Sequence, residues 1–268
     1  MLFHAKNGTT AIENDLMDYV RFGNGRKTLI MLPGLGDGLA TVKGMALPMA
    51  FMYRMLTKEY TVYMFSRRRA LPEGYTTRDM ARDQAKAMEL LNIEAADVIG
   101  VSMGGMIAQH LAADYPQRVN RLVLTVTAPC SNPLLTRNVQ EWVACAQQGD
   151  HTALMRSNVR QMYTDAYYRR NRWLIPIMGK LTKPASYRRF FIQAAACVAH
   201  DARESLSAIR AGTLVVGGGK DATVGGEPSQ QLAQAIDGAV LHMYDEGAHA
   251  LDEEEKGFFS LVLAFLNE

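Results

Sequence analysis

The feature that most constrains this chain is a serine between glycines, in the stretch Gly100-Val101-Ser102-Met103-Gly104-Gly105. A hydrophobic run over residues 96–101 leads into the serine, and a helix-compatible run over 106–115 follows it. In this setting the pattern G-x-S-x-G predicts a very tight strand-to-helix turn, with the serine in a strained backbone conformation and its hydroxyl above the sheet edge. Glycines are needed beside it because strand and helix pass too close for side chains. The turn therefore supplies a nucleophile, and the Met103 amide at the helix N-terminus can face a developing oxyanion.

Strand and helix patterns alternate along most of the chain. Apolar runs of strand length occur at 28–32, 61–65, 96–101, 119–126, 212–217 and 240–244. Such runs are typical of strands buried on both faces of a mostly parallel sheet. Helix patterns lie between them, and one begins at Thr76 with Asp79 three residues later, which resembles a capping box. The alternation predicts an α/β fold with right-handed crossovers and helices on both faces of the sheet.

The alternation stops in one long segment, from about Asn132 to Ser205. This segment is helix-compatible throughout and contains both tryptophans, Trp142 and Trp173. We interpret residues 132–205 as a helical cap inserted over the strand ends. Residues 1–131 and 206–268 are then expected to form the α/β core.

Length and charge limit the classes of function. The 268 residues are enough for one domain with an insertion and a sizeable core. Lys and Arg number 29 against 27 Asp and Glu, so the net charge of +2 provides no general field for nucleic acid or an anionic membrane. Two clusters of arginine, at 67–69 and 169–172, are interpreted as solvated faces.

The cysteines and the N-terminal residues indicate a compartment. Cys130, Cys145 and Cys197 are in no C-x-x-C spacing, which favours neither a disulfide framework nor a zinc site. The first residues have no apolar core of signal-peptide length, and no later run approaches the length of a membrane span. We therefore expect a cytoplasmic protein with no membrane or nucleic-acid partner. The sequence predicts no oligomeric state.

Two further residues complete a candidate catalytic set with Ser102. A serine hydroxyl needs a base within hydrogen-bond reach and a carboxylate to orient that base. Asp221 follows the predicted strand 212–217, and His249 follows the predicted strand 240–244. Catalytic groups in open α/β sheets gather at the carboxyl ends of the strands. We therefore expect these three side chains to converge on one edge of the sheet.

On these residues the chain resembles the α/β-hydrolase superfamily along nearly its whole length. Serine, then acid, then histidine is the order in that family. The matching motifs are Pro33-Gly34-Leu35-Gly36, Gly100-Val101-Ser102-Met103-Gly104-Gly105, Gly219-Lys220-Asp221 and Gly247-Ala248-His249. The resemblance implies the α/β-hydrolase fold, a mostly parallel central sheet with helices on both faces, and a four-helix cap inserted between strands 6 and 7.

The same resemblance implies a role for each matching residue. Ser102 is expected to be the nucleophile, His249 the general base and then the acid, and Asp221 its orienting carboxylate. The backbone amides of Leu35 and Met103 are expected to form the oxyanion hole. Two motifs depart from the family pattern. Pro33 stands where many relatives have histidine, and the arginine-rich turn at 67–70 contains no glycine.

Other acids and histidines have less favourable positions. Asp245 and Asp252 also lie close to His249 in sequence, and we interpret them as turn and cap residues. The remaining histidines lack the strand-end setting and are interpreted as surface or packing residues. They are His4, His110, His151, His200 and His242.

These residues predict a serine hydrolase of the carboxylesterase type, with an acyl-enzyme on Ser102. The aromatic residues of the cap and the face of the helix that carries Met45 suggest an apolar pocket, so the expected partner is a small or medium apolar ester. No metal or organic cofactor is implied. The alternatives that stay open are a thioesterase, an enol-lactone or C–C hydrolase, an aminopeptidase, a perhydrolase, or a ligand receptor with slow turnover. The serine argues against the dehalogenase and epoxide-hydrolase branches, which use aspartate.

Overall fold

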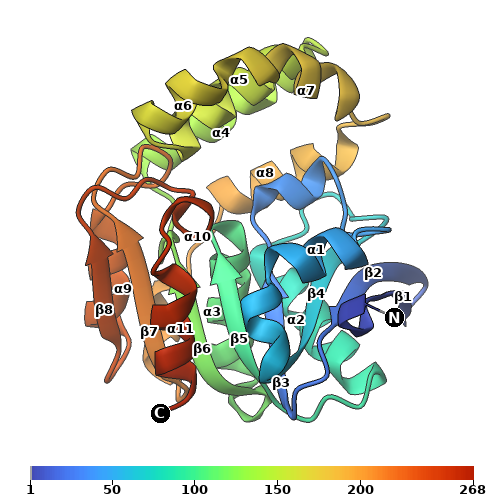
Figure 1. Ribbon diagram of the computed structural model, residues 1–268, viewed down its shortest axis with the longest axis vertical. Helices are drawn as coiled ribbons and strands as arrows, with labels where there is room; N and C mark the ends of the chain where they lie inside the picture. The colour runs from blue at the N-terminus through green and yellow to red at the C-terminus, as the bar shows by residue number, and fades with distance from the viewer. Residues whose placement is uncertain (1) are drawn as a thin grey trace.

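The computed structural model describes residues 2–268 and contains one eight-stranded sheet in the order β1-β2-β4-β3-β5-β6-β7-β8 (Figure 1). The strands are β1 (Lys6–Ile12), β2 (Asp15–Phe22), β3 (Lys27–Leu32), β4 (Tyr60–Arg68), β5 (Ala96–Val101), β6 (Val119–Thr125), β7 (Gly212–Gly218) and β8 (Val240–Tyr244). From β4 to β8 all neighbours are parallel, and β1 and β2 form an antiparallel hairpin at one edge. The predicted mostly parallel sheet is confirmed.

Helices cover both faces of the sheet, as the alternation predicts. One face carries α1 (Ala46–Met52) and α11 (Phe258–Leu266), and the other carries α2 (Thr77–Leu90), α3 (Met103–Asp114) and α9 (Glu227–Ala235) (Figure 1). A core of buried apolar side chains lies between each helical layer and the sheet. Helix α3 is buried over most of its length, so the serine turn that precedes it sits on a rigid element.

Two helix starts show how local sequence sets the elements. Thr76 caps α2, because its Oγ1 accepts a hydrogen bond from the Asp79 amide at 3.1 Å and its own amide donates to Asp79 Oδ2 at 3.0 Å. This is the predicted capping box. Asn132 caps the first helix after β6 in the same way, with Oδ1 accepting from the Leu135 amide at 2.9 Å, and Pro133 occupies the first helical turn.

The insertion between β6 and β7 is helical, as expected. It contains α4 (Pro133–Gln147), α5 (His151–Met162), α6 (Asp165–Asn171), α7 (Ile175–Leu181) and α8 (Arg188–Val198). These five α-helices are one more than the resemblance implied, because a 3-10 turn at Arg172–Leu174 separates α6 from α7. In Figure 1, α4 to α7 form a layer above the sheet, and α8 lies below them. Helix α8 contacts the short 3-10 helix η2 (Leu35–Gly38) of the core. We keep 132–205 as the proposed extent of the cap.

The first arginine cluster is not a solvated face, which corrects the sequence interpretation. Arg67 and Arg68 are buried, because β4 continues to Arg68 and runs under α2. Arg68 donates to Asp83 of α2 at 2.6 and 2.8 Å. Arg69 is half-exposed and pairs with Asp18 at 2.7 Å, which lowers the pKa of that carboxyl. The arginines at 169, 170 and 172 are exposed, as predicted.

The apolar helices all belong to the two packed layers or the cap. Within residues 2–268, none of them combines the length and apolar character that crossing a bilayer requires.

Gly104 provides a test of how tightly α3 packs on the sheet. A Cβ atom there would lie 2.8 Å from the Pro33 carbonyl oxygen and closer still to that of Leu32. Because both are backbone atoms, they cannot move aside as a flexible side chain would. We expect Gly104→Ala to lower the free energy of unfolding by about 3 kcal/mol or more, measured by urea unfolding.

Gly36 is the matched control for this substitution. A Cβ at Gly36 would meet nothing within 4 Å, so Gly36→Ala should change the free energy of unfolding by less than about 0.5 kcal/mol. If Gly104→Ala unfolded at the same urea concentration as the control, this result would contradict the close packing of α3 on β3.

Candidate active site

Ser102 lies on the predicted tight turn between β5 and α3. Its backbone has φ 54 and ψ −122, a strained conformation for a residue with a side chain. The surrounding structure holds this conformation through hydrogen bonds. The Ser102 amide donates to the Thr125 carbonyl at 2.9 Å, and its carbonyl accepts from the Gly105 amide at 2.8 Å and from Thr127 Oγ1 at 2.7 Å. Side chains at Gly100 and Gly105 would clash with neighbouring atoms at 2.6 Å, as the motif predicts.

The three residues of the candidate catalytic set meet in one hydrogen-bonded chain. His249 Nε2 lies 2.9 Å from Ser102 Oγ, and His249 Nδ1 lies 2.7 Å from Asp221 Oδ2. Asp221 Oδ1 accepts from the amides of Thr223 and Val224 at 2.8 and 2.9 Å. These bonds orient the carboxylate so that its second oxygen faces the imidazole. Nδ1 then donates to Asp221, which leaves Nε2 free to accept the serine proton.

The competing residues have other surroundings. Asp245 is exposed, and Asp252 makes no hydrogen bond to His249 among the described residues. His110, His151 and His200 are buried packing residues, as expected. Asp221 is therefore the carboxylate bonded to His249. The catalytic roles of the three residues stay predictions.

The expected oxyanion hole lies beside the serine. Leu35 begins the short helix η2 (Leu35–Gly38), and Met103 is the first residue of α3. Neither amide has an acceptor within residues 2–268. The loop passes so close to the serine that a Cβ at Gly34 would lie 3.4 Å from Ser102 Cβ. Glycine at this position thus lets the loop backbone approach the nucleophile.

A cavity of about 420 Å³ opens onto Ser102 and His249. Its apolar wall combines residues of the core and the cap, among them Leu35, Leu39, Val42, Met45, Met49, Tyr53, Met64, Trp142, Leu154, Met162 and Phe190. The volume is in the range of small-molecule sites. Met45 belongs to the expected apolar pocket, and one cap tryptophan, Trp142, lines it whereas Trp173 is exposed.

Comparison with known proteins identifies the family. Residues 27–255 match the sequence model of a protein family that is described as "alpha/beta hydrolase fold". The chain belongs to this family. It is 30% identical over 256 residues to a 2-hydroxymuconate semialdehyde hydrolase of Pseudomonas sp. (strain CF600), covering 90% of this chain and 87% of that protein.

Two solved structures show the same alpha/beta hydrolase fold. The enol-lactonase from Burkholderia xenovorans LB400 matches with a TM-score of 0.82 at 24% identity, covering 97% of this chain and 100% of that one. MGS-M2, an alpha/beta hydrolase from a Medee basin deep-sea metagenome library, matches with a TM-score of 0.84 at 20% identity, covering 97% and 98%. At these identities the similarity concerns the fold alone.

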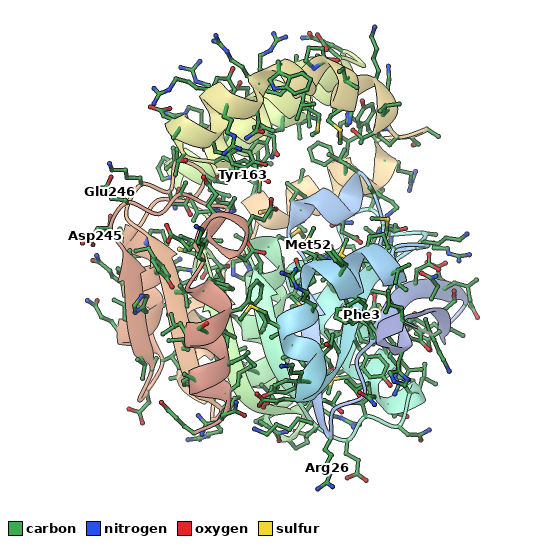
Figure 2. All side chains as sticks on the ribbon, in the orientation of Figure 1. Phe3, Arg26, Met52, Tyr163, Asp245 and Glu246 are labelled. Carbon is green, nitrogen blue, oxygen red and sulfur yellow. The ribbon has the colours of Figure 1, made fainter. Side chains whose placement is uncertain are left out.

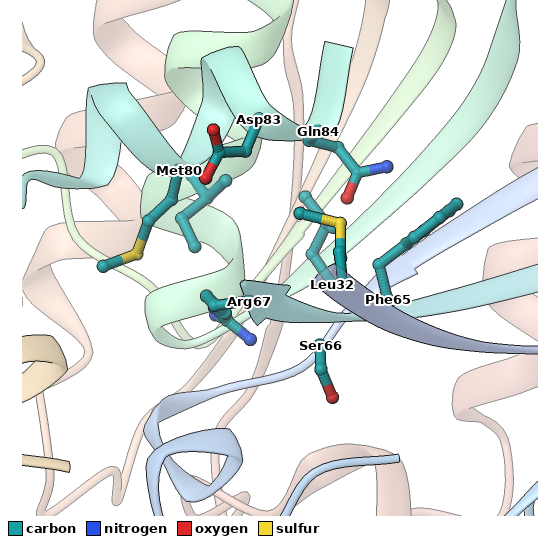
Figure 3. Close-up of a pocket in the computed structure, with 9 residues that line it drawn as sticks. Leu32, Phe65, Ser66, Arg67, Met80, Asp83 and Gln84 are labelled. Carbon is teal, nitrogen blue, oxygen red and sulfur yellow. The ribbon is translucent and has the colours of Figure 1, made fainter. Parts of the chain in front are cut away.

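The departures from the family pattern at Pro33 and Arg67 meet in one contact. Arg67 Nη2 donates to the Pro33 carbonyl at 2.6 Å, directly before the oxyanion loop. Burial lowers the pKa of Arg67. The guanidinium lines a cavity of only about 10 Å³ together with Leu32, Phe65, Ser66, Met80, Asp83 and Gln84 (Figure 3). Sequence reasoning missed this residue, because a run of three arginines gave no signal that one of them is buried beneath a loop.

Asp37 joins the same loop to the cap. Its Oδ2 accepts from the Arg67 amide at 3.2 Å, from Arg189 Nη2 at 2.7 Å and from Gln193 Nε2 at 3.0 Å. Arg189 and Gln193 belong to α8. The oxyanion loop is therefore held between β4 and the cap by a buried acceptor with three donors.

The loops that carry Asp221 and His249 also contact the cap. Asn138 of α4 donates to the Ala222 carbonyl at 2.8 Å, next to Asp221. On the histidine side, the Thr164 amide and Oγ1 donate to Glu254 at 3.0 and 2.7 Å, and Tyr163 donates to Glu253 at 2.6 Å. Figure 2 shows Tyr163 at the junction between the cap and α10 (Leu251–Glu254). All three site loops thus depend on cap contacts.

Asp252 is one of three acids in the cavity wall, with Asp37 and Glu253, and lies three residues after His249. Burial, with the nearby charge of Glu253, raises the pKa of Asp252 to about 6. Its ordinary value is 3.8. The folded protein therefore binds a proton at this carboxyl more tightly than the unfolded chain does.

The raised pKa of Asp252 predicts a pH-dependent stability. Protonation of this carboxyl stabilises the folded state as the pH falls from about 7 to about 4, because the folded state takes up the proton first. Asn at this position cannot titrate. Asp252→Asn should therefore exceed wild type in free energy of unfolding at pH 8, by an amount of the order of 1–3 kcal/mol, and lose this advantage between about pH 6 and pH 4.

Urea unfolding of both proteins across this pH range measures the effect. The exposed Asp237, changed to Asn, controls for the loss of a negative charge elsewhere. A difference between wild type and Asp252→Asn that stayed constant with pH would contradict the raised pKa.

Proposed function

We propose that this alpha/beta hydrolase cleaves small or medium carboxylic esters through an acyl-enzyme on Ser102. The observation that supports the proposal best is the hydrogen-bonded chain from Ser102 through His249 to Asp221, at 2.9 and 2.7 Å. Ser102 and His249 of this hydrogen-bonded set line a cavity with a largely apolar wall. Ester hydrolysis is the reaction that asks least of such a site, because the alcohol is a better leaving group than an amine or a carbanion.

The first half of the reaction forms the acyl-enzyme. Ser102 Oγ attacks the ester carbonyl carbon while His249 Nε2 takes the serine proton. The amides of Leu35 and Met103 stabilise the resulting oxyanion, each contributing about 3 kcal/mol. As the intermediate collapses, the bond to the alcohol oxygen breaks and His249 gives its proton to that oxygen. Asp221 holds the imidazole in the tautomer that these transfers need.

The second half of the reaction returns the enzyme to its starting state. A water molecule attacks the acyl carbon and gives a proton to His249. The same two amides stabilise the second oxyanion. Collapse breaks the bond to Ser102 Oγ, which regains its proton from His249, and the carboxylic acid leaves.

Carbon–carbon bond hydrolysis is the second candidate. The specific observation in its favour is the 30% identity to the 2-hydroxymuconate semialdehyde hydrolase of Pseudomonas over 90% of this chain. The same hydrogen-bonded set of side chains serves as the starting point for either reaction. A substrate panel therefore has to contain both kinds of bond.

The proposed function predicts repeated turnover that depends on Ser102. We expect wild type to hydrolyse p-nitrophenyl esters of short and medium acyl chains. Ser102→Ala should lower kcat by roughly a factor of a million, and Asp221→Asn by roughly ten thousand. Steady-state rates on the ester panel, with 2-hydroxymuconate semialdehyde added as the C–C substrate, measure these effects. Far-UV circular dichroism checks that both variants fold.

Covalent labelling separates the possible outcomes. A fluorophosphonate should add once to wild type and not to Ser102→Ala, as read by intact mass. Labelling without turnover of any ester would overturn the esterase proposal and favour a ligand receptor, whereas turnover confined to the C–C substrate would favour the second candidate. Absence of labelling would mean that Ser102 is not an activated nucleophile.

A further inference from the structure

The cavity wall carries negative charge without a compensating cation. The acids among its lining residues within 2–268 are Asp37, Asp252 and Glu253, and none of these lining residues is lysine or arginine. Arg189 pairs with Asp37 at 2.7 Å. Lys256 does not line the cavity, but it lies in a surface groove that Asp252 and Glu253 also line. A ligand in the cavity therefore meets carboxylates and no free positive side chain of the wall.

Asp252 occupies a position that stability alone does not explain. It lies on the short helix α10, one turn after His249, and its carboxylate has no hydrogen-bond or ion-pair partner within the described residues. The ionisable groups around it include Glu253, Tyr53, His249 and Tyr163. An unpaired carboxylate in a partly buried, mostly apolar wall costs free energy. Such a cost is typical of groups kept for binding or catalysis.

Glu253 extends the negative wall toward the cap. Its Oε2 accepts from the Tyr163 hydroxyl at 2.6 Å, which fixes the carboxylate beside the cavity. A tyrosine donor leaves the charge of the carboxylate in place, whereas a lysine or arginine would neutralise it. Glu253 is exposed, so solvent screens its charge more than that of the partly buried Asp252.

We propose that Asp252, together with Glu253, selects the charge of the substrate, so that the cavity accepts neutral esters and esters with an ammonium group and rejects esters with a free carboxylate. This inference rests on the proposed function. It gives the two residues a role in specificity, because like charges placed close together in a partly desolvated site repel each other strongly. In this arrangement the reacting carbonyl lies beside Ser102, and the charged end of the acyl group interacts with Asp252 and Glu253.

Three matched esters test the proposal. They are the p-nitrophenyl half-ester of glutaric acid, a p-nitrophenyl ester of the same chain length that ends in a trimethylammonium group, and the uncharged tert-butyl analogue of the latter. Each kcat/KM is divided by the rate constant for hydroxide hydrolysis of the same ester, which removes intrinsic reactivity. For wild type we expect the neutral and cationic esters to exceed the anionic one by roughly tenfold or more.

Substitution of the acids should change these ratios. Asp252→Asn should lower the neutral-to-anionic ratio about tenfold and lower the cationic-to-neutral ratio in parallel. Asp252→Asn combined with Glu253→Gln should extend both changes. Asp237→Asn, on an exposed turn after α9, removes the same charge away from the cavity and should leave both ratios as in wild type. Thermal unfolding verifies that every variant is folded.

The outcomes separate this inference from the proposed function. Ratios that stayed the same in the double variant as in wild type would overturn the charge selection while leaving ester hydrolysis intact. If no ester were turned over, the proposed function would fail. The charge preference would then be read from protection of Ser102 against a fluorophosphonate by the matching alkyl carboxylate and alkyl ammonium ions. Equal protection by the two ions would overturn the inference in that case too.

Discussion

The site depends on one strained turn. Ser102 adopts φ 54 and ψ −122, and a non-glycine residue in such a conformation costs of the order of 1–3 kcal/mol. The strain persists because packing and hydrogen bonds around Ser102 hold its backbone in this conformation. Gly104 packs against the backbone of Leu32. The Ser102 amide donates to the Thr125 carbonyl, and the Ser102 carbonyl accepts from the Gly105 amide and Thr127 Oγ1. The result is a hydroxyl fixed above the sheet edge, within 2.9 Å of His249.

The cap completes the site as well as covering it. Asp37 connects the oxyanion loop to α8, Asn138 connects the loop of Asp221 to α4, and Glu254 connects the loop of His249 to Thr164. Because three loops from distant parts of the chain share this support, their relative positions depend on the placement of the cap. The cap helices α4, α5 and α8 also contribute Trp142, Leu154, Met162 and Phe190 to the apolar wall of the cavity. Substrate binding and the geometry of the site are thus physically linked.

Local sequence patterns predict most of the fold and the three candidate catalytic residues. The spacing of apolar runs predicts the parallel strands, since strands buried on both faces need continuous apolar residues. The serine between glycines predicts the turn, and Asp221 and His249 follow from their positions at strand ends. These signals are local, so they can be read without knowing what lies across the sheet. The family match over residues 27–255 agrees with them.

The burial and contacts of the charged residues follow from the packing of distant segments and are not predicted by local patterns. Arg67 reads as one of three solvated arginines, yet it lies under the oxyanion loop because β4 extends beneath α2. Asp252 reads as a turn residue, yet it faces the cavity because the cap closes over α10. Burial depends on contacts between elements that are far apart in sequence, and a local sequence pattern does not show which distant elements will pack together. The charge of the cavity therefore emerges only when core and cap are assembled.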